Sequence, residues 1–166
     1  MVRRMRGTGL DKHSASASLP SYLGRGIASG LLGTAVMTVF QKAIEMPVTG
    51  RGDSYAPADF AQRVLPLTPG SPAARDRLNY TTHFALGTLW GSAYGVAARL
   101  GMSGQRAVAA AFVSVYTTDV LLNTALGLYQ PSTWSKRDWA IDVIDKLVQA
   151  EATGVIFDSH LRPPTR

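Results

Sequence analysis

The sequence has no cysteine and shows none of the common catalytic motifs. Without cysteine among its 166 residues, disulfides, thiolate metal sites and a cysteine nucleophile are excluded. It also lacks a G-x-S-x-G elbow, an H-E-x-x-H zinc motif, a phosphate-binding P-loop and a G-x-G-x-x-G turn. These absences favour a non-enzymatic protein without a cofactor or a metal site.

Charged residues are scarce over long parts of the chain, although the whole chain carries a net charge of +6. The charges gather in four stretches, at residues 1–25, 42–78, 99–106 and 136–166. Basic loops beside a membrane and a basic nucleic-acid surface would both explain this pattern. Because no basic stripe alternates with aromatic residues and no RNA-binding signature is present, we expect no nucleic-acid partner.

Three almost uncharged runs lie between these stretches, at residues 26–41, 79–98 and 107–129. A bilayer core about 30 Å thick needs roughly 20 apolar residues per helix, and Lys42 extends the first run to this length by snorkelling. The sixteen glycines also favour a membrane, because glycine lets helices pack closely in lipid. We interpret the runs as spanning helices in contact with a lipid bilayer. Core helices of a soluble bundle are the alternative.

A fourth, more polar helix is expected over residues 138–158. Asp142 and Lys146 are among the charges that interrupt its apolar residues. Ser135, three residues before Asp138, has the spacing of a capping box at the start of a helix. Such a helix either spans the membrane with its polar face inward or lies along the interface, and we favour spanning.

The predicted fold class is therefore all-α, a polytopic membrane four-helix bundle. We expect a flexible basic tail at residues 1–24, a helical domain at 25–161 and a C-terminal tail at 162–166. The connection at 42–78 contains Pro57, which predicts a short helix lying on the membrane surface. The first run has no small-residue cleavage site, so we expect it to be retained. Lysine and arginine near the span ends favour both termini in the cytoplasm of a bacterial inner membrane.

Glycines recur at intervals of four residues on two of the expected helices. Gly87, Gly91 and Gly95 form two overlapping G-x-x-x-G patterns, and Gly26 and Gly30 begin a similar ridge in the first run. Faces of this kind allow another helix to approach closely. We expect them to pack within the bundle, and a homo-oligomer built through them is the alternative.

One acidic residue stands near the middle of the third run. At about 1.5 Å per residue, Asp119 lies roughly 18 Å from Ala107, just beyond the midplane of a bilayer. Tyr116 and Asn123 lie on the same face of the helix. A carboxylate exposed to lipid at this depth costs about 2.5–3.5 kcal/mol. This face must therefore point toward protein or water.

Helices that alternate in direction bring other polar residues to a similar depth. We expect one internal polar cluster in the outer half of the bundle, with Asp119 paired to Lys146 or His83. Its members are Lys42, His83, Tyr116, Asp119, Asn123, Asp142, Asp145 and Lys146. The cluster is either a salt-bridged core that fixes helix register or a site that handles protons or ions.

The order of these features is similar to that of a known group of proteins. A glycine-rich first span and a long proline-containing loop precede "THFALGTLWGSAYG", which has the form H-x₃-G-x₃-G-x₃-G, and "STWSKRDWAIDVIDKLVQAEATGVIFD" closes the pattern. Over residues 25–160 the chain resembles the YagU-like and related small four-helix bacterial inner-membrane proteins, most of them of unknown function. The resemblance implies a location and an architecture, and no reaction.

Three classes of function are compatible with the sequence. We expect a non-enzymatic accessory or stress-related component of the inner membrane. The alternative is a small proton- or ion-coupled transporter or channel that uses the Asp119 and His83 cluster. A soluble helical binding protein is the third class, and it requires the apolar runs to be core helices.

Overall fold

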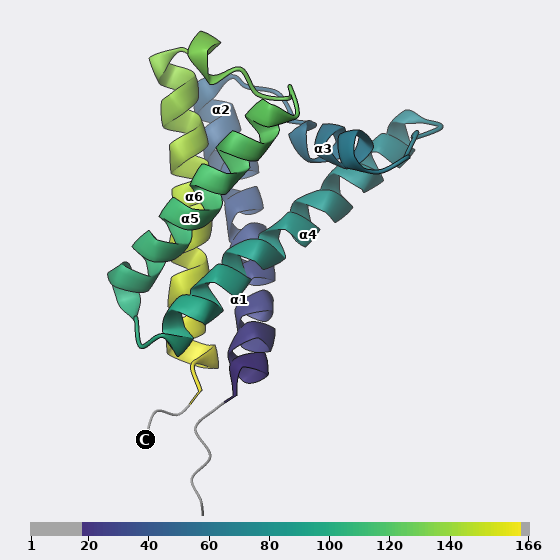
Figure 1. The fold of residues 1–166 in the computed structure, drawn as a ribbon. Helices are drawn as coiled ribbons and strands as arrows, with labels where there is room; N and C mark the ends of the chain where they lie inside the picture. The colour runs from purple at the N-terminus through teal and green to yellow at the C-terminus, as the bar shows by residue number, and fades with distance from the viewer. Residues whose placement is uncertain (1–17, 164–166) are drawn as a thin grey trace, which may run out of the picture.

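The computed structural model describes residues 18–163, and these residues form helices without a β-strand (Figure 1). The all-α prediction is confirmed. Four long helices correspond to the four expected from the sequence: α1 (Leu19–Phe40), α4 (Pro72–Arg99), α5 (Gly104–Ala125) and α6 (Lys136–Ile156). Five shorter helical segments connect or extend them: η1 (Gln41–Glu45), α2 (Met46–Thr49), α3 (Ala56–Val64), η2 (Pro131–Thr133) and η3 (Phe157–Leu161).

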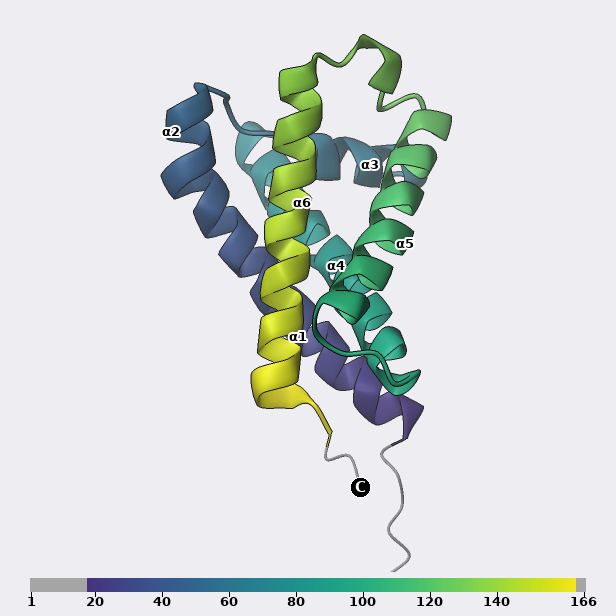
Figure 2. The same ribbon diagram turned by 90° about the vertical axis from the view of Figure 1, so that its left-hand side faces the viewer.

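The long helices alternate in direction. In Figure 1, α1 and α5 run upward, α4 and α6 run downward, and both ends of the described chain lie at the lower end. Figure 2 shows α6 between α1 and α5, with α4 crossing behind them. Up-down order thus places the connections 50–71 and 126–135 at the upper end of the molecule. The prediction that the polar residues share one depth requires this order.

The first helix is longer at both ends than the sequence indicated. It begins at Leu19, so residues 19–24 are helical and are not part of a flexible tail, while residues 1–17 lie outside the described part. Pro20 does not break the helix, because a proline in the first turn has no hydrogen bond to lose. At the other end the helix continues through η1 and α2 as far as Thr49, so the long connection begins after Thr49 and not at Lys42.

The expected C-terminal tail is also partly wrong. Arg162 donates hydrogen bonds to Asp158 and to the backbone carbonyl of Met102, and Pro163 is buried. These contacts fasten the end of the chain to the connection between α4 and α5. Residues 164–166 lie outside the described part.

Two predicted helix starts are confirmed. Ser135 accepts a hydrogen bond from the backbone N–H of Asp138, and the Asp138 side chain accepts one from the backbone N–H of Ser135, which completes the capping box of α6. In α3, Pro57 stands in the first turn, as expected. Both starts follow from local chemistry, because unpaired N–H groups at a helix start need an acceptor or a proline.

The glycine faces of α1 and α4 pack against each other in the lower half of the bundle. A Cβ atom added at Gly91 would lie 1.8 Å from the Gly26 carbonyl oxygen, and one at Gly30 would lie 2.5 Å from the Gly87 carbonyl oxygen. The same contact continues to Gly95, where an added Cβ would lie 2.6 Å from the Tyr22 carbonyl oxygen. The two backbones therefore touch, and the ridges that suggested a homo-oligomer are buried within one chain.

Large aliphatic side chains are exposed on all four long helices. Examples are Leu32 and Val36 on α1, Leu89 and Val96 on α4, Val113 and Leu121 on α5, and Ile144 and Val155 on α6. Most of the buried side chains are small, aromatic or polar, including Ser29, Thr34, Asn123, Asp145, Gln149 and Thr153. A protein in water would bury its aliphatic residues first, so this distribution is typical of helices that face lipid.

Two helices are long and apolar enough to cross a membrane, namely the continuous helix Leu19–Thr49 and α5. In the most apolar 18-residue stretch of each helix, only 28% of the Leu19–Thr49 stretch and 22% of the α5 stretch is buried. A core helix of a soluble protein is mostly buried. The more polar helices α4 and α6 do not reach this level of hydropathy, so the four expected spans reduce to two on composition alone. The difference arises because α6 carries Asp142, Asp145, Lys146 and Glu151, and because the uncharged part of α4 is rich in neutral polar residues and glycine.

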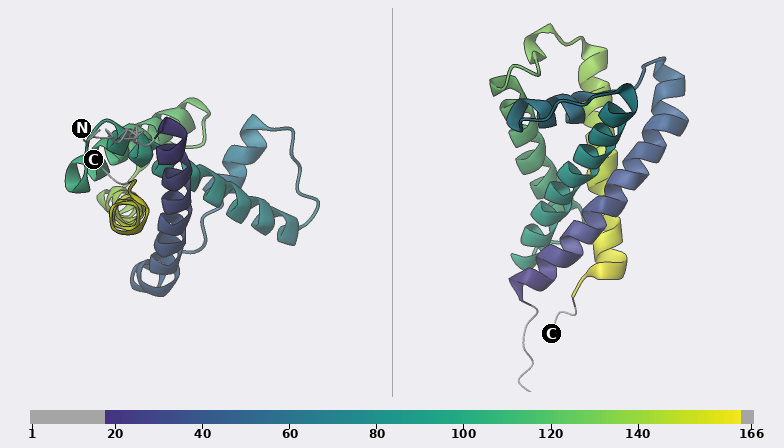
Figure 3. Two further views of the ribbon diagram at one scale, coloured as in Figure 1. Left: turned by 90° about the horizontal axis from the view of Figure 1, so that it is seen from below. Right: turned by 90° about the vertical axis from the view of Figure 1, so that its right-hand side faces the viewer.

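Helix α3 lies across α4 near the upper end of the molecule (Figure 3). The phenol of Tyr55 donates a hydrogen bond to Asp76 (2.5 Å), and this bond raises the pKa of Tyr55, because the carboxylate favours the protonated phenol. Arg75 pairs with Asp59 (2.8 Å) from the same two helices. These contacts hold the connection 50–71 beside α4, where it forms one wall of the cavity described below.

Candidate functional site

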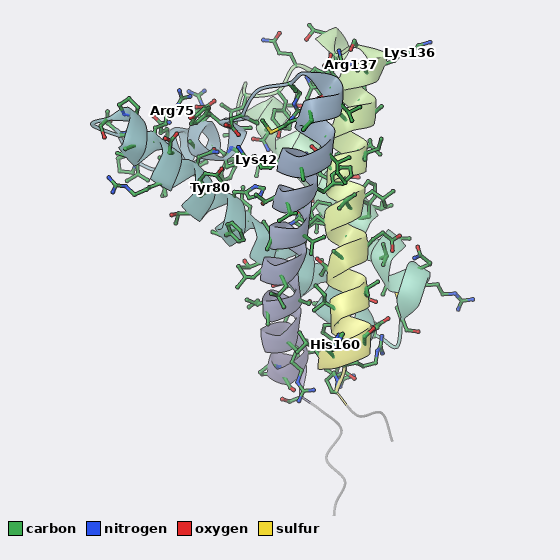
Figure 4. All side chains as sticks on the ribbon, turned by 180° about the vertical axis from the view of Figure 1, so that it is seen from behind. Lys42, Arg75, Tyr80, Lys136, Arg137 and His160 are labelled. Atoms are coloured by element: carbon green, nitrogen blue, oxygen red, sulfur yellow. The ribbon has the colours of Figure 1, made fainter. Side chains whose placement is uncertain are left out.

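A polar cavity of about 180 Å³ opens at the upper end of the bundle. The glycine contact holds α1 and α4 together in the lower half, and above it the two helices diverge (Figure 1). The cavity is lined by η1 and the end of α1 on one side, α4 on another and α6 behind, with further residues from α5 and the connection 50–60. Figure 4 shows Lys42 of η1 and Tyr80 of α4 close together at its mouth, where both side chains are exposed.

Lys146 of α6 binds two carboxylates at the back of the cavity. Its Nζ lies 2.5 Å from Asp142 Oδ1 and 3.3 Å from Asp119 Oδ2, and all three side chains are less than one quarter exposed. Tyr116 donates a hydrogen bond to Asp142 (2.9 Å), and Asn123 donates one to Asp119 (2.9 Å). Asp119 therefore pairs with Lys146, one of its two expected partners, and this network joins α5 to α6.

Asp145, one turn before Gln149 on α6, is buried next to η1. Its Oδ2 accepts a hydrogen bond from Gln41 Nε2 (2.8 Å), whereas Oδ1 is buried and has no hydrogen-bond partner among the described residues. Only 4% of Asp145 is exposed. Glu45 lies one turn after Gln41, is 6% exposed and lines the same cavity. A buried carboxylate oxygen without a partner is energetically unfavourable, and such an atom calls for a ligand, a proton or water.

The floor of the cavity is a layer of neutral polar side chains. Thr38 lies 3.1 Å from His83 Nε2, and Gln149 donates a hydrogen bond to Thr34 (2.7 Å). Thr34 is fully buried and donates to the Gly30 carbonyl (2.8 Å). Because these groups bond to each other and the glycine contact lies directly below, the cavity is closed toward the lower end.

Two more charges stand at the mouth. Lys42 forms an ion pair with Asp53, and both side chains are about half exposed. Arg51, also exposed, lines the cavity without an ion pair to any described residue. Three cationic side chains and five carboxylates thus line the cavity, which leaves an excess of negative charge with His83 neutral.

The residues of the expected polar cluster are at this cavity, although they do not form one bonded network. Lys42, His83, Asp119, Asn123, Asp142, Asp145 and Lys146 line it, and Tyr116 supports Asp142 from behind. His83 bonds to Thr38 and not to Asp119. Among residues 18–163, no three His, Asp or Glu side chains are placed to hold a metal ion.

Sequence reasoning missed Gln41 and Glu45, which lie on a π-helical turn. Gln41, Lys42 and Glu45 stand at i, i+1 and i+4 of this continuous helix, so they share one face, and all three line the cavity. π-turns inside helices are frequent at functional sites. The spacing of Gln41, Lys42 and Glu45 would have indicated a shared helix face, but the prolines that follow indicated a loop from Lys42 onward.

No protein-family model, curated protein or solved structure matches the chain. The resemblance in helix count and glycine spacing therefore stays an expectation.

Proposed function

We propose that the protein is an integral protein of a bacterial inner membrane in which all four long helices span the bilayer. The observation that supports this most is the aliphatic surface on each of α1, α4, α5 and α6, combined with a polar and glycine-rich interior. Helix α6 turns Asp142, Asp145 and Lys146 toward the cavity, and α4 turns its neutral polar residues Asn79, Tyr80 and His83 toward it, so the low hydropathy of both helices is compatible with spanning. The termini then lie together on one side, which we assign to the cytoplasm.

We further propose that the cavity handles protons or small cations, and that the protein works as a proton- or ion-coupled transporter. The supporting observation is the partnerless Oδ1 of Asp145 in a cavity with excess negative charge. Ionisable residues inside a membrane bundle are typical of ion pathways. A cavity that is closed at its floor fits a transporter open to one side better than a continuous channel.

Proton movement into liposomes that enclose a pH-sensitive dye tests this proposal. We expect a proton flux with the purified full-length protein, abolished by Asp119→Asn and by Asp145→Asn. The matched control is Glu151→Gln, which removes a carboxylate of α6 outside the cavity and should leave the flux unchanged. Equal flux through wild type and both cavity variants, or flux no greater than in empty liposomes, would overturn the proposal.

A second candidate is a non-enzymatic accessory component in which the charges serve structure alone. The Lys146 network favours it for Asp119 and Asp142, because both carboxylates already bind the same ammonium group. On this alternative, the variants lower stability and no flux is measured. This alternative does not explain why Asp145 Oδ1 is buried without a hydrogen-bond partner among the described residues.

A further inference from the structure

We propose that the corner of the cavity formed by Asp145 and Glu45 binds an organic cation through an ammonium or guanidinium group. This inference rests on the proposed function and names its substrate class. It starts from the carboxylates that line the cavity, because some of them form an ion pair with a lysine and others form none.

The ion pairs account for three of the five carboxylates. Lys146 neutralises Asp119 and Asp142, and Lys42 neutralises Asp53. Asp145 and Glu45 have no ion-pair partner among the described residues, although each is more than nine-tenths buried. Their only side-chain bonds come from the neutral donors Gln41 and Thr49.

Two neighbouring buried carboxylates need positive charge and N–H donors. Glu45 acts electrostatically on Asp145, and both face the same cavity. Arg51 and Lys146 also act on Asp145, more weakly, but neither forms an ion pair with Asp145 or Glu45. A proton on Asp145 would remove its charge, but it would leave the Glu45 carboxylate without a cation among the described residues. An ammonium or guanidinium group supplies both the charge and the donors, and charge-assisted hydrogen bonds of this kind are the strong ones.

The other walls of the cavity suit an organic cation better than a metal ion. Phe60, Tyr80, Trp90 and Tyr129 line it, and aromatic rings attract cations and cover alkyl groups. Metal binding is disfavoured, because no set of three ligating side chains is in place among residues 18–163. A volume of about 180 Å³ holds a cationic head with a short alkyl chain, since a cavity of roughly 150 Å³ holds benzene.

Isothermal titration calorimetry of the full-length protein in a non-ionic detergent tests the inference. The probes are n-butylammonium chloride, 1-butylguanidinium chloride and, as the uncharged isostere, 1-butanol. We expect saturable binding of one or both cations and no saturable binding of 1-butanol. Asp145→Asn and Glu45→Gln should each weaken cation binding roughly tenfold or more. Glu151→Gln, on α6 outside the cavity, is the matched control and should leave binding unchanged.

The variants keep the shape of the side chains, and gel filtration shows whether each one is folded. The wild-type comparison of butylammonium with butanol stands even where a variant does not fold. Equal binding of butanol, no saturable binding of either cation, or unchanged affinity in both folded variants would overturn the inference. Proton flux without cation binding would refute this inference alone, whereas cation binding without flux would refute the proposed transport alone.

Discussion

The carboxylate in the middle of the third apolar run is stabilised by a lysine from another helix. Asp119 and Asp142 share Lys146, Asn123 donates a hydrogen bond to Asp119 Oδ1, and Tyr116 donates one to Asp142. An Asp at this depth is tolerable only when it is paired, because an isolated charge in an apolar medium is strongly unfavourable. Asp119 differs from Asp145 in having an ion-pair partner, because Asp119 Oδ2 lies 3.3 Å from Lys146 Nζ, whereas Asp145 forms no ion pair with any described residue.

Replacing Lys146 should be more harmful than replacing either of its partners. Lys146→Met leaves Asp119 and Asp142 buried without a cation, and breaking a buried ion pair in this way costs about 3 kcal/mol or more. At roughly 2–4 °C per kcal/mol, the Tm in detergent should fall by roughly 6–12 °C. Thermal unfolding followed by circular dichroism measures the change.

The control is the exposed pair at the mouth of the cavity. Lys42→Met removes the same charge from a pair whose side chains are 42% and 55% exposed, and exposed pairs contribute at most about 1 kcal/mol. Its Tm should therefore stay within a few degrees of wild type. Equal losses in the two variants would contradict the difference in burial on which the account of Asp119 depends.

The sequence predicted which residues lie at the site better than it predicted the hydrogen bonds and ion pairs between them. Depth along alternating helices correctly indicated that Asp119 and Lys146 could meet. It could not predict the hydrogen bond between His83 and Thr38, because the position of a residue along a helix does not determine how the helix is rotated about its own axis. Gln41 and Glu45 escaped prediction, because the sequence indicated a loop from Lys42 onward, whereas the helix continues to Thr49.

Helix starts are the elements for which local sequence carries most of the information. Ser135→Ala removes the acceptor for the Asp138 N–H and should destabilise the protein by about 1 kcal/mol. The chain offers a matched control, because Ser103 occupies the same position at α5 without a side-chain capping bond. Ser103→Ala should change stability by less than about 0.5 kcal/mol. Thermal melts of both variants measure the difference, and equal effects would show that the capping box is not stabilising.

Close contact between α1 and α4 gives a second prediction at the scale of the element. Gly91→Ala places a methyl group against the Gly26 carbonyl and should cost about 1–3 kcal/mol or more, since the backbones must separate. Gly24→Ala, also in a helix, meets nothing within 4 Å and should stabilise the protein by up to about 1 kcal/mol. Unfolding temperatures of the two variants should therefore move in opposite directions. A Gly91→Ala variant as stable as wild type would contradict the contact.

The glycine spacing in the sequence predicted that these faces pack, and left open whether they do so within one chain. That choice depends on the relative rotation of α1 and α4, which G-x-x-x-G patterns do not encode. The same rotation opens the cavity above the contact, so the position of the site follows from the packing of Gly26 against Gly91.

On the scale of the whole molecule, the absence of cysteine makes the lipid-facing surface directly testable. Val113→Cys lies on the exposed aliphatic face of α5, and Gly52→Cys lies at the mouth of the cavity. In membrane vesicles permeable to the reagent, a charged methanethiosulfonate should modify Gly52→Cys and spare Val113→Cys, because thiolates form only where water reaches. Both variants should react after denaturation in dodecyl sulfate. Rapid modification of Val113→Cys in the vesicles would place that face in water.

The overall arrangement follows from an interior that is more polar than the surface. Exposed aliphatic residues on all four long helices and a polar cavity between them are compatible with a bilayer and unfavourable in water. The sequence predicted three spans and favoured a fourth, whereas hydropathy alone supports α1 and α5 only, in part because Asp142, Asp145 and Lys146 lower the hydropathy of α6 although they line the cavity. Whether these helices are embedded in a bilayer is therefore the central claim.

Alkaline extraction of membranes from cells that express the C-terminally tagged chain tests this claim most directly. Carbonate at high pH removes peripheral proteins and leaves integral ones in the membrane pellet. The account predicts that the chain stays in the pellet together with a known integral protein, and that detergent is needed to release it. Release into the supernatant would contradict the account, because the exposed aliphatic faces and the cavity would then belong to a water-soluble bundle.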